Sequence, residues 1–136
     1  MADFARVPEE DELLAAQVVD AAIRVHRLLG PGLLESVYET CLCHELGKRG
    51  VGYSSQAILP VMYDGVRLDA GLRLDLLVGN RVIVELKATE RMLPLYEAQL
   101  LTYLKQSGLR LGLLMNFNVP LLKDGITDSL ALRLRP

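Results

Sequence analysis

The stretch GLRLDLLVGNRVIVELKA, residues 71–88, sets charged side chains among apolar residues that are typical of a buried β-hairpin. Runs of Leu, Val and Ile on both sides of Gly79-Asn80 predict two antiparallel strands joined by a tight turn. Asp75, Glu85 and Lys87 interrupt these runs. A carboxylate or an ammonium group inside a sheet core costs several kcal/mol unless it is compensated, so these charges are either exposed or kept for a function.

The length of the hairpin loop decides whether the charged groups share a face. Glu85 and Lys87 are two residues apart on one strand, so their side chains project from the same face. A two-residue loop, 79–80, would send Asp75 and Glu85 to opposite faces. A three-residue loop, 79–81, or a nearby bulge, would instead oppose Asp75 directly to Glu85. The sequence leaves both registers open.

If the three groups converge, they form a site suited to a divalent cation. Two carboxylates a few Å apart repel each other, and a cation between them removes that repulsion. Mg²⁺ typically takes one or two protein carboxylates, keeps several waters and accepts phosphate oxygens from a substrate. Such a site suits phosphodiester chemistry, in which Lys87 could orient the attacking water or offset developing charge. The alternative is that all three charges are solvated strand ends.

The rest of the chain predicts a mixed central sheet flanked by helices. Apolar residues at steps of three and four predict helices, and segments with a period near two predict strands. In chain order the predicted elements are helices at 9–29 and 33–49, three strands of an antiparallel meander within 53–88, a helix at 94–107, a strand at 109–117 and an edge strand in the tail, 125–136. The strand at 109–117 is expected beside its predecessor, through a crossover. This order predicts an α/β fold class.

Composition limits the classes of protein that the chain can belong to. With 136 residues and 15.1 kDa, it can bury one core, and residues 1–136 are expected to form a single domain. No apolar run approaches the roughly 18 to 20 residues that span a bilayer, so no membrane partner is expected. The acidic N-terminal stretch is unlike a secretory or transit peptide, which predicts a cytoplasmic protein. A net charge of −2 excludes an overall basic surface that coats nucleic acid nonspecifically.

Several further motifs accompany the charged hairpin. They are G-x-x-E-x-x-Y at Gly32, Glu35 and Tyr38, R-x-D at Arg73 and Asp75, VELKA around Glu85 and Lys87, and Gln99 four residues before Tyr103. In this order, with LLMNF following, they resemble the GxxExxY family, which is assigned to the PD-(D/E)XK nuclease superfamily. The resemblance extends from about residue 13 to residue 126.

The resemblance implies a PD-(D/E)XK, restriction endonuclease-like core and a metal-dependent nuclease that uses Mg²⁺ or Mn²⁺. It implies that Asp75 and Glu85 are metal ligands and that Lys87 is the catalytic lysine. Glu35 would support or complete the metal site, although the helix dipole alone also favours an acid at that position. Gln99 would contact the metal site or the nucleic-acid backbone, or else it is a polar residue at the helix rim. The expected substrate-binding residues are Arg73, Tyr38 and Tyr103.

Nucleic acid, and DNA in particular, is the expected partner, and two rival functions stay open. One is a noncatalytic interaction module on the nuclease fold, acting as a homodimer or within a larger complex, and the acidic pI of about 5.7 favours it. The other is a relative that acts on RNA or nucleotides. His26, which could suggest a general base, is expected to be a hydrogen-bonded histidine near the core.

Overall fold

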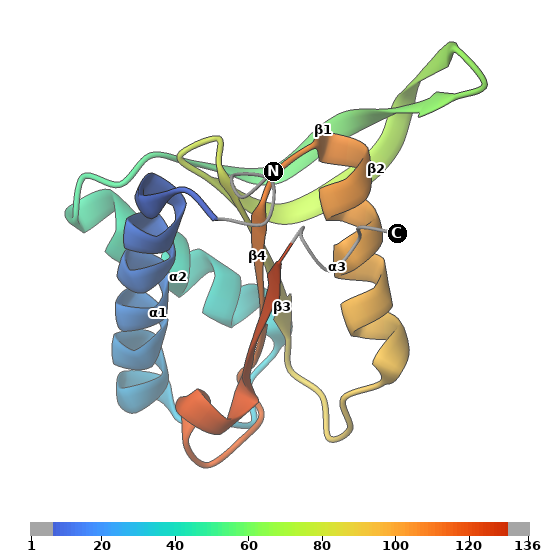
Figure 1. Ribbon diagram of the computed structural model, residues 1–136. Helices are drawn as coiled ribbons and strands as arrows, with labels where there is room; N and C mark the ends of the chain where they lie inside the picture. The colour runs from blue at the N-terminus through green and yellow to red at the C-terminus, as the bar shows by residue number, and fades with distance from the viewer. Residues whose placement is uncertain (1–6, 131–136) are drawn as a thin grey trace.

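A five-stranded mixed sheet separates two helices from a third (Figure 1). The computed structural model describes residues 7–130, and side chains as far as residue 127. Its elements are α1 (Glu9–Leu29), α2 (Glu35–Lys48), β1 (Tyr53–Tyr63), β2 (Val66–Val78), β3 (Val82–Lys87), α3 (Pro94–Ser107), β4 (Leu111–Asn116), the 3₁₀ helix η2 (Leu122–Gly125) and β5 (Ile126–Leu130). The predicted α/β class, with a mixed sheet flanked by helices, is confirmed.

The strands follow the order β1-β2-β3-β4-β5 across the sheet. The first three form an antiparallel meander, and α3 carries the chain across to β4, which is parallel to β3. β5 pairs antiparallel with β4 at the edge. The predicted meander, crossover and edge strand are therefore present. The short helix η2 was not predicted, and residues 131–136 of the predicted tail strand lie outside the described residues.

Apolar side chains pack on both faces of the sheet. On one face, α1 and α2 contribute residues such as Val18 and Leu42, which lie in one cluster with Val84 of β3. On the other face, Leu100 of α3 packs in a second cluster with Ile83. β3 and β4 are buried along almost their whole length, as expected for central strands covered on both sides. These two strands form the rigid support of the fold.

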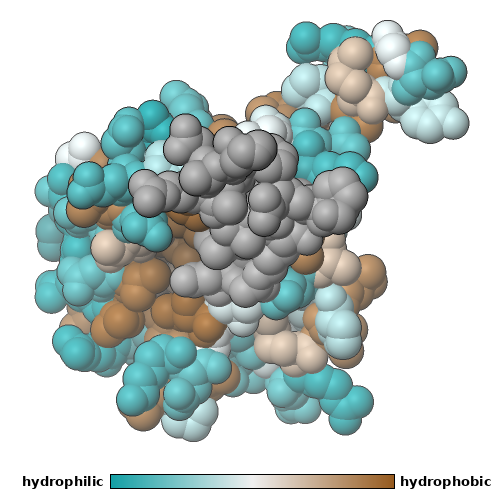
Figure 2. Space-filling view, viewed as in Figure 1, coloured by the Kyte–Doolittle hydropathy of each residue, from teal (hydrophilic) through white to brown (hydrophobic). Residues whose placement is uncertain are grey.

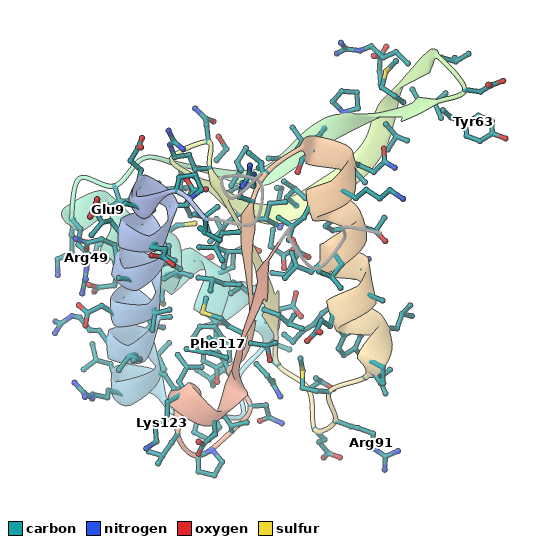
Figure 3. The ribbon with its side chains drawn as sticks, viewed as in Figure 1. Glu9, Arg49, Tyr63, Arg91, Phe117 and Lys123 are labelled. Carbon is teal, nitrogen blue, oxygen red and sulfur yellow. The ribbon has the colours of Figure 1, made fainter. Side chains whose placement is uncertain are left out.

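β1 and β2 extend beyond the sheet as a two-stranded arm, residues 60–71, that stands clear of the rest of the surface (Figures 1 and 2). Residues 66–71 are all exposed, and Tyr63 lies at the tip of the arm (Figure 3). The register shifts between Leu59 and Val61. At the base of the arm a Cβ on Gly71 would clash with the Val61 side chain, so glycine is required there. The arm is thus a twisted ribbon with its own internal packing.

Candidate active site

The loop between β2 and β3 has three residues, and this length decides the register of the charged hairpin. Val78 opposes Val82, and the pairing continues to Leu76 opposite Val84. Gly79 and Asn80, with φ values of 59° and 56°, form the left-handed turn. The register that this loop sets brings Asp75 opposite Glu85, which is the alternative that places both carboxylates at one site.

Backbone N–H groups of the two strands hold the carboxylates of Asp75 and Glu85. The Asp75 N–H donates to Glu85 Oε2 at 2.9 Å, and the Leu86 N–H donates to Asp75 Oδ2 at 2.8 Å. The regular pairing of β2 with β3 ends at Leu76, so each carboxylate accepts an N–H just beyond the last ladder pair. Both acidic side chains are therefore fixed at the point where the two strands separate.

Three carboxyl groups at this point have pKa values above their ordinary range. Burial, followed by the charge of Asp75, raises the pKa of Glu85 to about 8, and the Glu85 residue is only 7% exposed. Burial also raises the pKa of Asp75, although the Leu86 N–H lowers it in part. The pKa of Glu35 is raised by burial and then by the charge of Asp75. Burial is thus the largest cause for all three groups, and the charge of Asp75 adds to it for Glu85 and Glu35.

This set of oxygen donors fits a hard divalent cation. Within residues 7–127, no three side chains of His, Cys, Asp or Glu lie close enough together to hold a metal ion by themselves. Asp75 and Glu85 fit an ion that completes its coordination with water and substrate oxygens, and this is the usual manner of Mg²⁺.

Lys87 lies two residues after Glu85 on β3, with Nζ 4.3 Å from the centre of the Tyr96 ring. Its positive charge lowers the pKa values of Asp75, Glu85 and Glu35 in part, so it lies within electrostatic reach of all three. The aromatic face of Tyr96 stabilises the ammonium group on the side of α3. This contact with Tyr96 was not predicted from the sequence.

Helix α3 presents Gln99 and Tyr103 at the same site. Gln99 is exposed, and its Nε2 donates to the Tyr103 hydroxyl at 2.8 Å. The pKa of Tyr103 is raised by burial and then by the negative charges of Glu85 and Asp75. Tyr103 therefore lies near the carboxylates, and Gln99 joins the site through Tyr103.

Helix α2 brings Glu35 to the site from the opposite face of the sheet. Glu35 is the first residue of α2, directly after the Gly30-Pro31-Gly32 turn, where both glycines have positive φ. The Tyr38 hydroxyl donates to the Gly30 carbonyl at 2.6 Å and accepts from the Leu33 N–H at 3.0 Å. These bonds fix the turn and hence the start of the helix that carries Glu35.

The position of Tyr38 corrects its predicted role in substrate binding. Its side chain is fully buried and stacks on Phe117, with ring centres 4.6 Å apart. Phe117 lies between the sheet and helices α1 and α2 (Figure 3). A substrate cannot reach a ring in this core, so Tyr38 has a structural role.

The family model described as the PD-(D/E)XK nuclease superfamily matches residues 12–128 of the chain. The chain belongs to the PD-(D/E)XK nuclease superfamily. Members of this superfamily are generally metal-dependent nucleases, which implies a nucleic-acid substrate and a divalent metal. Membership of the GxxExxY family stays a prediction. No curated protein and no solved structure matches the chain.

Membership of the PD-(D/E)XK superfamily agrees with the order of the acidic residues and Lys87 on β2 and β3. Among the described residues, none of the helices is both long enough and apolar enough to cross a membrane. His26 lies apart from the carboxylates, with Nε2 at 3.1 Å from the Phe117 carbonyl and 2.8 Å from the Val119 carbonyl. The prediction that His26 is a hydrogen-bonded histidine near the core is confirmed.

A polar network beside the candidate site was not predicted from the sequence. Gln56 of β1 donates from Nε2 to both carboxylate oxygens of Glu39, at 2.9 and 3.1 Å. Its Oε1 accepts from Arg73 Nε at 2.8 Å. Glu39 follows Glu35 by four residues on α2, so it shares a helical face with Glu35, and that spacing was the available signal. Arg73 is exposed at the base of the arm, as a substrate-binding residue needs to be.

Proposed function

We propose that the protein is a Mg²⁺-dependent nuclease that hydrolyses phosphodiester bonds in DNA. The observation that carries the proposal is a pair of hydrogen bonds where β2 leaves β3: the Asp75 N–H orients the Glu85 carboxylate, and the Leu86 N–H orients the Asp75 carboxylate. Lys87 lies on the same strand as Glu85 and within electrostatic reach of both acids. Two oriented carboxylates and an ammonium group suit metal-assisted hydrolysis of a phosphodiester bond.

The roles of the residues follow from their charge and position. Asp75 and Glu85 would hold Mg²⁺ or Mn²⁺, and Glu35 adds a third carboxylate at the edge of the site. When bound, the ion polarises the phosphoryl group and lowers the pKa of a water molecule. Lys87 orients the attacking water and offsets the charge that develops on the phosphoryl oxygens. The Tyr96 ring keeps the Lys87 ammonium beside the acids.

Substrate binding is assigned to exposed or half-buried groups around the carboxylates. Arg73 donates from Nε to Gln56 Oε1, and its two terminal NH₂ groups can bind a phosphate. Gln99 and Tyr103 form a hydrogen-bonded pair on α3 that can contact the nucleic-acid backbone. Among the described residues, four carboxylates, those of Glu35, Glu39, Asp75 and Glu85, lie around the site with the two cations Lys87 and Arg73, so the ion also helps a polyanion to approach.

Replacing the proposed catalytic lysine tests the enzyme. Lys87→Met should lower cleavage of DNA in Mg²⁺ by about 10³-fold or more, because it removes a charge that acts on the nucleophile and the transition state. Lys105→Met, at an exposed position of α3, is the matched control and should cleave as the wild type does. The substrates are plasmid, linear duplex, single-stranded DNA and RNA, each with and without EDTA. Equal cleavage by wild type and Lys87→Met would contradict the proposal, and faster cleavage of RNA would favour the RNA-acting relative.

Metal binding is measured separately from cleavage. Calorimetry with Mn²⁺ should detect weak binding that Asp75→Asn abolishes, since one remaining carboxylate offsets too little of the cost of dehydrating the ion. Asp69→Asn, which removes an exposed charge on the arm, should leave binding unchanged. A wild type that binds Mn²⁺ and cuts no nucleic acid would support the noncatalytic interaction module instead.

A further inference from the structure

Gln56 lies within a strand in a backbone conformation that strand residues rarely adopt. Its φ is +54°, in the left-handed region. Among the described residues other than glycine, only Asp64 and Asn80 also have positive φ, and both lie in hairpin turns. Such backbone conformations persist where surrounding contacts hold them, and they often redirect a side chain.

The kink at Gln56 stands directly across from Asp75. Ser55 pairs with Leu76 and Ala57 pairs with Leu74, so the residues between them face each other without forming a regular ladder pair. The unusual backbone of β1 and the proposed metal ligand of β2 therefore occupy the same step of the sheet.

Both ends of the Gln56 side-chain amide make hydrogen bonds. Nε2 donates to Glu39, and Oε1 accepts from Arg73. Hydrogen bonding by the Gln56 side chain also lowers the pKa of the Asp75 carboxyl in part. Since an amide nitrogen carries two hydrogens, Nε2 can donate one to Glu39 and direct the other to Asp75 across the strand pair. The amide thus stands between two carboxylates that would otherwise repel each other.

We propose that Gln56 is a positioning residue that fixes the Asp75 carboxylate in the orientation in which Oδ2 accepts the Leu86 N–H. Glu39 and Arg73 anchor the Gln56 amide from both sides, so the orientation of Asp75 depends on α2 as well as on the sheet. The consequence for catalysis rests on the proposed nuclease function, whereas the effect on Asp75 itself does not.

The test uses the metal-free protein and two substitutions that remove the amide. Gln56→Gly also relieves the left-handed backbone, whereas Gln56→Ala retains it. The thermal midpoint should therefore stay at or above that of the wild type for Gln56→Gly and fall for Gln56→Ala. Asp64→Gly is the matched control, because it relieves a left-handed residue, φ +51°, at the far end of the arm.

The decisive readout is hydrogen exchange at the Leu86 amide, followed by NMR. Without Gln56, the Asp75 carboxylate can rotate away, and the Leu86 amide should exchange about tenfold faster in both Gln56 variants, which corresponds to about 1.4 kcal/mol. The Val84 amide, within the paired part of the sheet, serves as the reference for overall opening. Asp64→Gly should leave the Leu86 rate unchanged. A Leu86 rate that is unchanged, or that only follows the Val84 rate, in Gln56→Gly would overturn the positioning role.

Calorimetry with Mn²⁺ gives the link to function. Both Gln56 variants should bind Mn²⁺ about tenfold more weakly than the wild type, and Asp64→Gly should bind it equally. Unchanged Mn²⁺ affinity with faster Leu86 exchange would overturn the claim that the orientation of Asp75 matters for the ion. If the wild type binds no Mn²⁺, the proposed metal site fails, and the Leu86 exchange rates still decide whether Gln56 positions Asp75.

Discussion

The two halves of strand β2 share a continuous backbone but have different surroundings. Residues 66–71 pair only with β1 in the arm and are exposed, whereas residues 72–78 are mostly buried beneath helices. The proposed active site lies in the inner half, just where its pairing with β3 ends. The comparison indicates that the core holds the backbone in place, while the end of the ladder leaves N–H groups that can orient carboxylates.

Core and arm should differ most in how much an apolar side chain contributes to the free energy of unfolding. Ile83→Ala, at a fully buried position of β3, should lower the free energy of unfolding by about 3 kcal/mol because it leaves a cavity. Met62→Ala, at a position 57% exposed on the arm, should change it by less than about 0.5 kcal/mol. Urea denaturation measures both. A similar loss for Met62→Ala would mean that the arm contributes to the stability of the core.

The buried Glu85, at the point where β2 and β3 separate, should make the metal-free protein less stable as the pH rises. The pKa of Glu85 is raised to about 8 in the folded chain, against 4.5 as its ordinary value. The folded protein therefore keeps a proton that the unfolded chain loses, so stability is highest at low pH and falls between about pH 5 and pH 8. Each unit of pKa difference is worth about 1.4 kcal/mol, and we expect a loss of about 2 kcal/mol or more.

Two variants separate this effect from other titrations. Glu85→Gln should remove most of the fall in stability, which thermal denaturation in EDTA can follow, and the raised pKa values of Asp75 and Glu35 should leave a smaller fall. Asp69→Asn, on the arm, should leave the pH dependence as it is, because the Asp69 side chain is 85% exposed. A wild type whose stability is flat from pH 5 to pH 8 would contradict the raised pKa of Glu85.

Two arginines offer a matched comparison for nucleic-acid binding. Arg73 at the base of the arm donates from Nε to Gln56, and Arg67 near the tip donates from Nε to Asp69, both at 2.8 Å. In a Lys87→Met background, Arg73→Ala should weaken DNA binding about tenfold. The slope of log K against log salt concentration should also fall by about one unit, which corresponds to the loss of one phosphate contact. Arg67→Ala should weaken binding less than about twofold. Fluorescence anisotropy measures both, and equal losses would extend the binding surface along the arm.

The smallest effect concerns a buried hydroxyl that holds the turn before α2. Tyr38→Phe should cost about 1 kcal/mol, since it leaves the Gly30 carbonyl and the Leu33 N–H without their partner. It should also lower nuclease activity about fivefold, because the turn fixes the start of α2 and hence the position of Glu35. Tyr63→Phe, at the tip of the arm, is the control and should change neither quantity. Loss of stability without loss of activity would mean that the turn does not position Glu35 for activity.

Periodicity in the sequence was sufficient to predict most of the fold. Apolar spacing over residues 9–29 predicted α1 with the observed bounds. For α3, the bounds follow from Pro94, which suits the first turn of a helix, and from Gly108, which ends it. The helix predicted at 33–49 begins two residues later, at Glu35, because residues 31–34 form the turn that Tyr38 holds. These signals are local, and local signals can be read from one chain.

The site was only partly predictable, because it depends on register and on contacts between distant elements. The sequence contained Asp75, Glu85 and Lys87 but allowed two loop lengths, of which only the loop 79–81 brings the acids together. Nothing near Gln56 indicates a left-handed residue, since its kink depends on the strand opposite. The burial of Tyr38 against Phe117 likewise joins residues far apart in sequence.

The two irregular positions in β1, Gln56 and Pro60, also bear on pairing between copies of the chain at high concentration. β1 is an edge strand of eleven residues that carries exposed Ile58 and Met62, a combination that invites another chain to add a strand. Pro60 has no N–H to offer such a chain, and it lies where the register shifts. Together with the kink at Gln56, it interrupts the regular edge, which disfavours pairing with a strand of another chain. The features that shape the border of the site thus also work against aggregation through this edge.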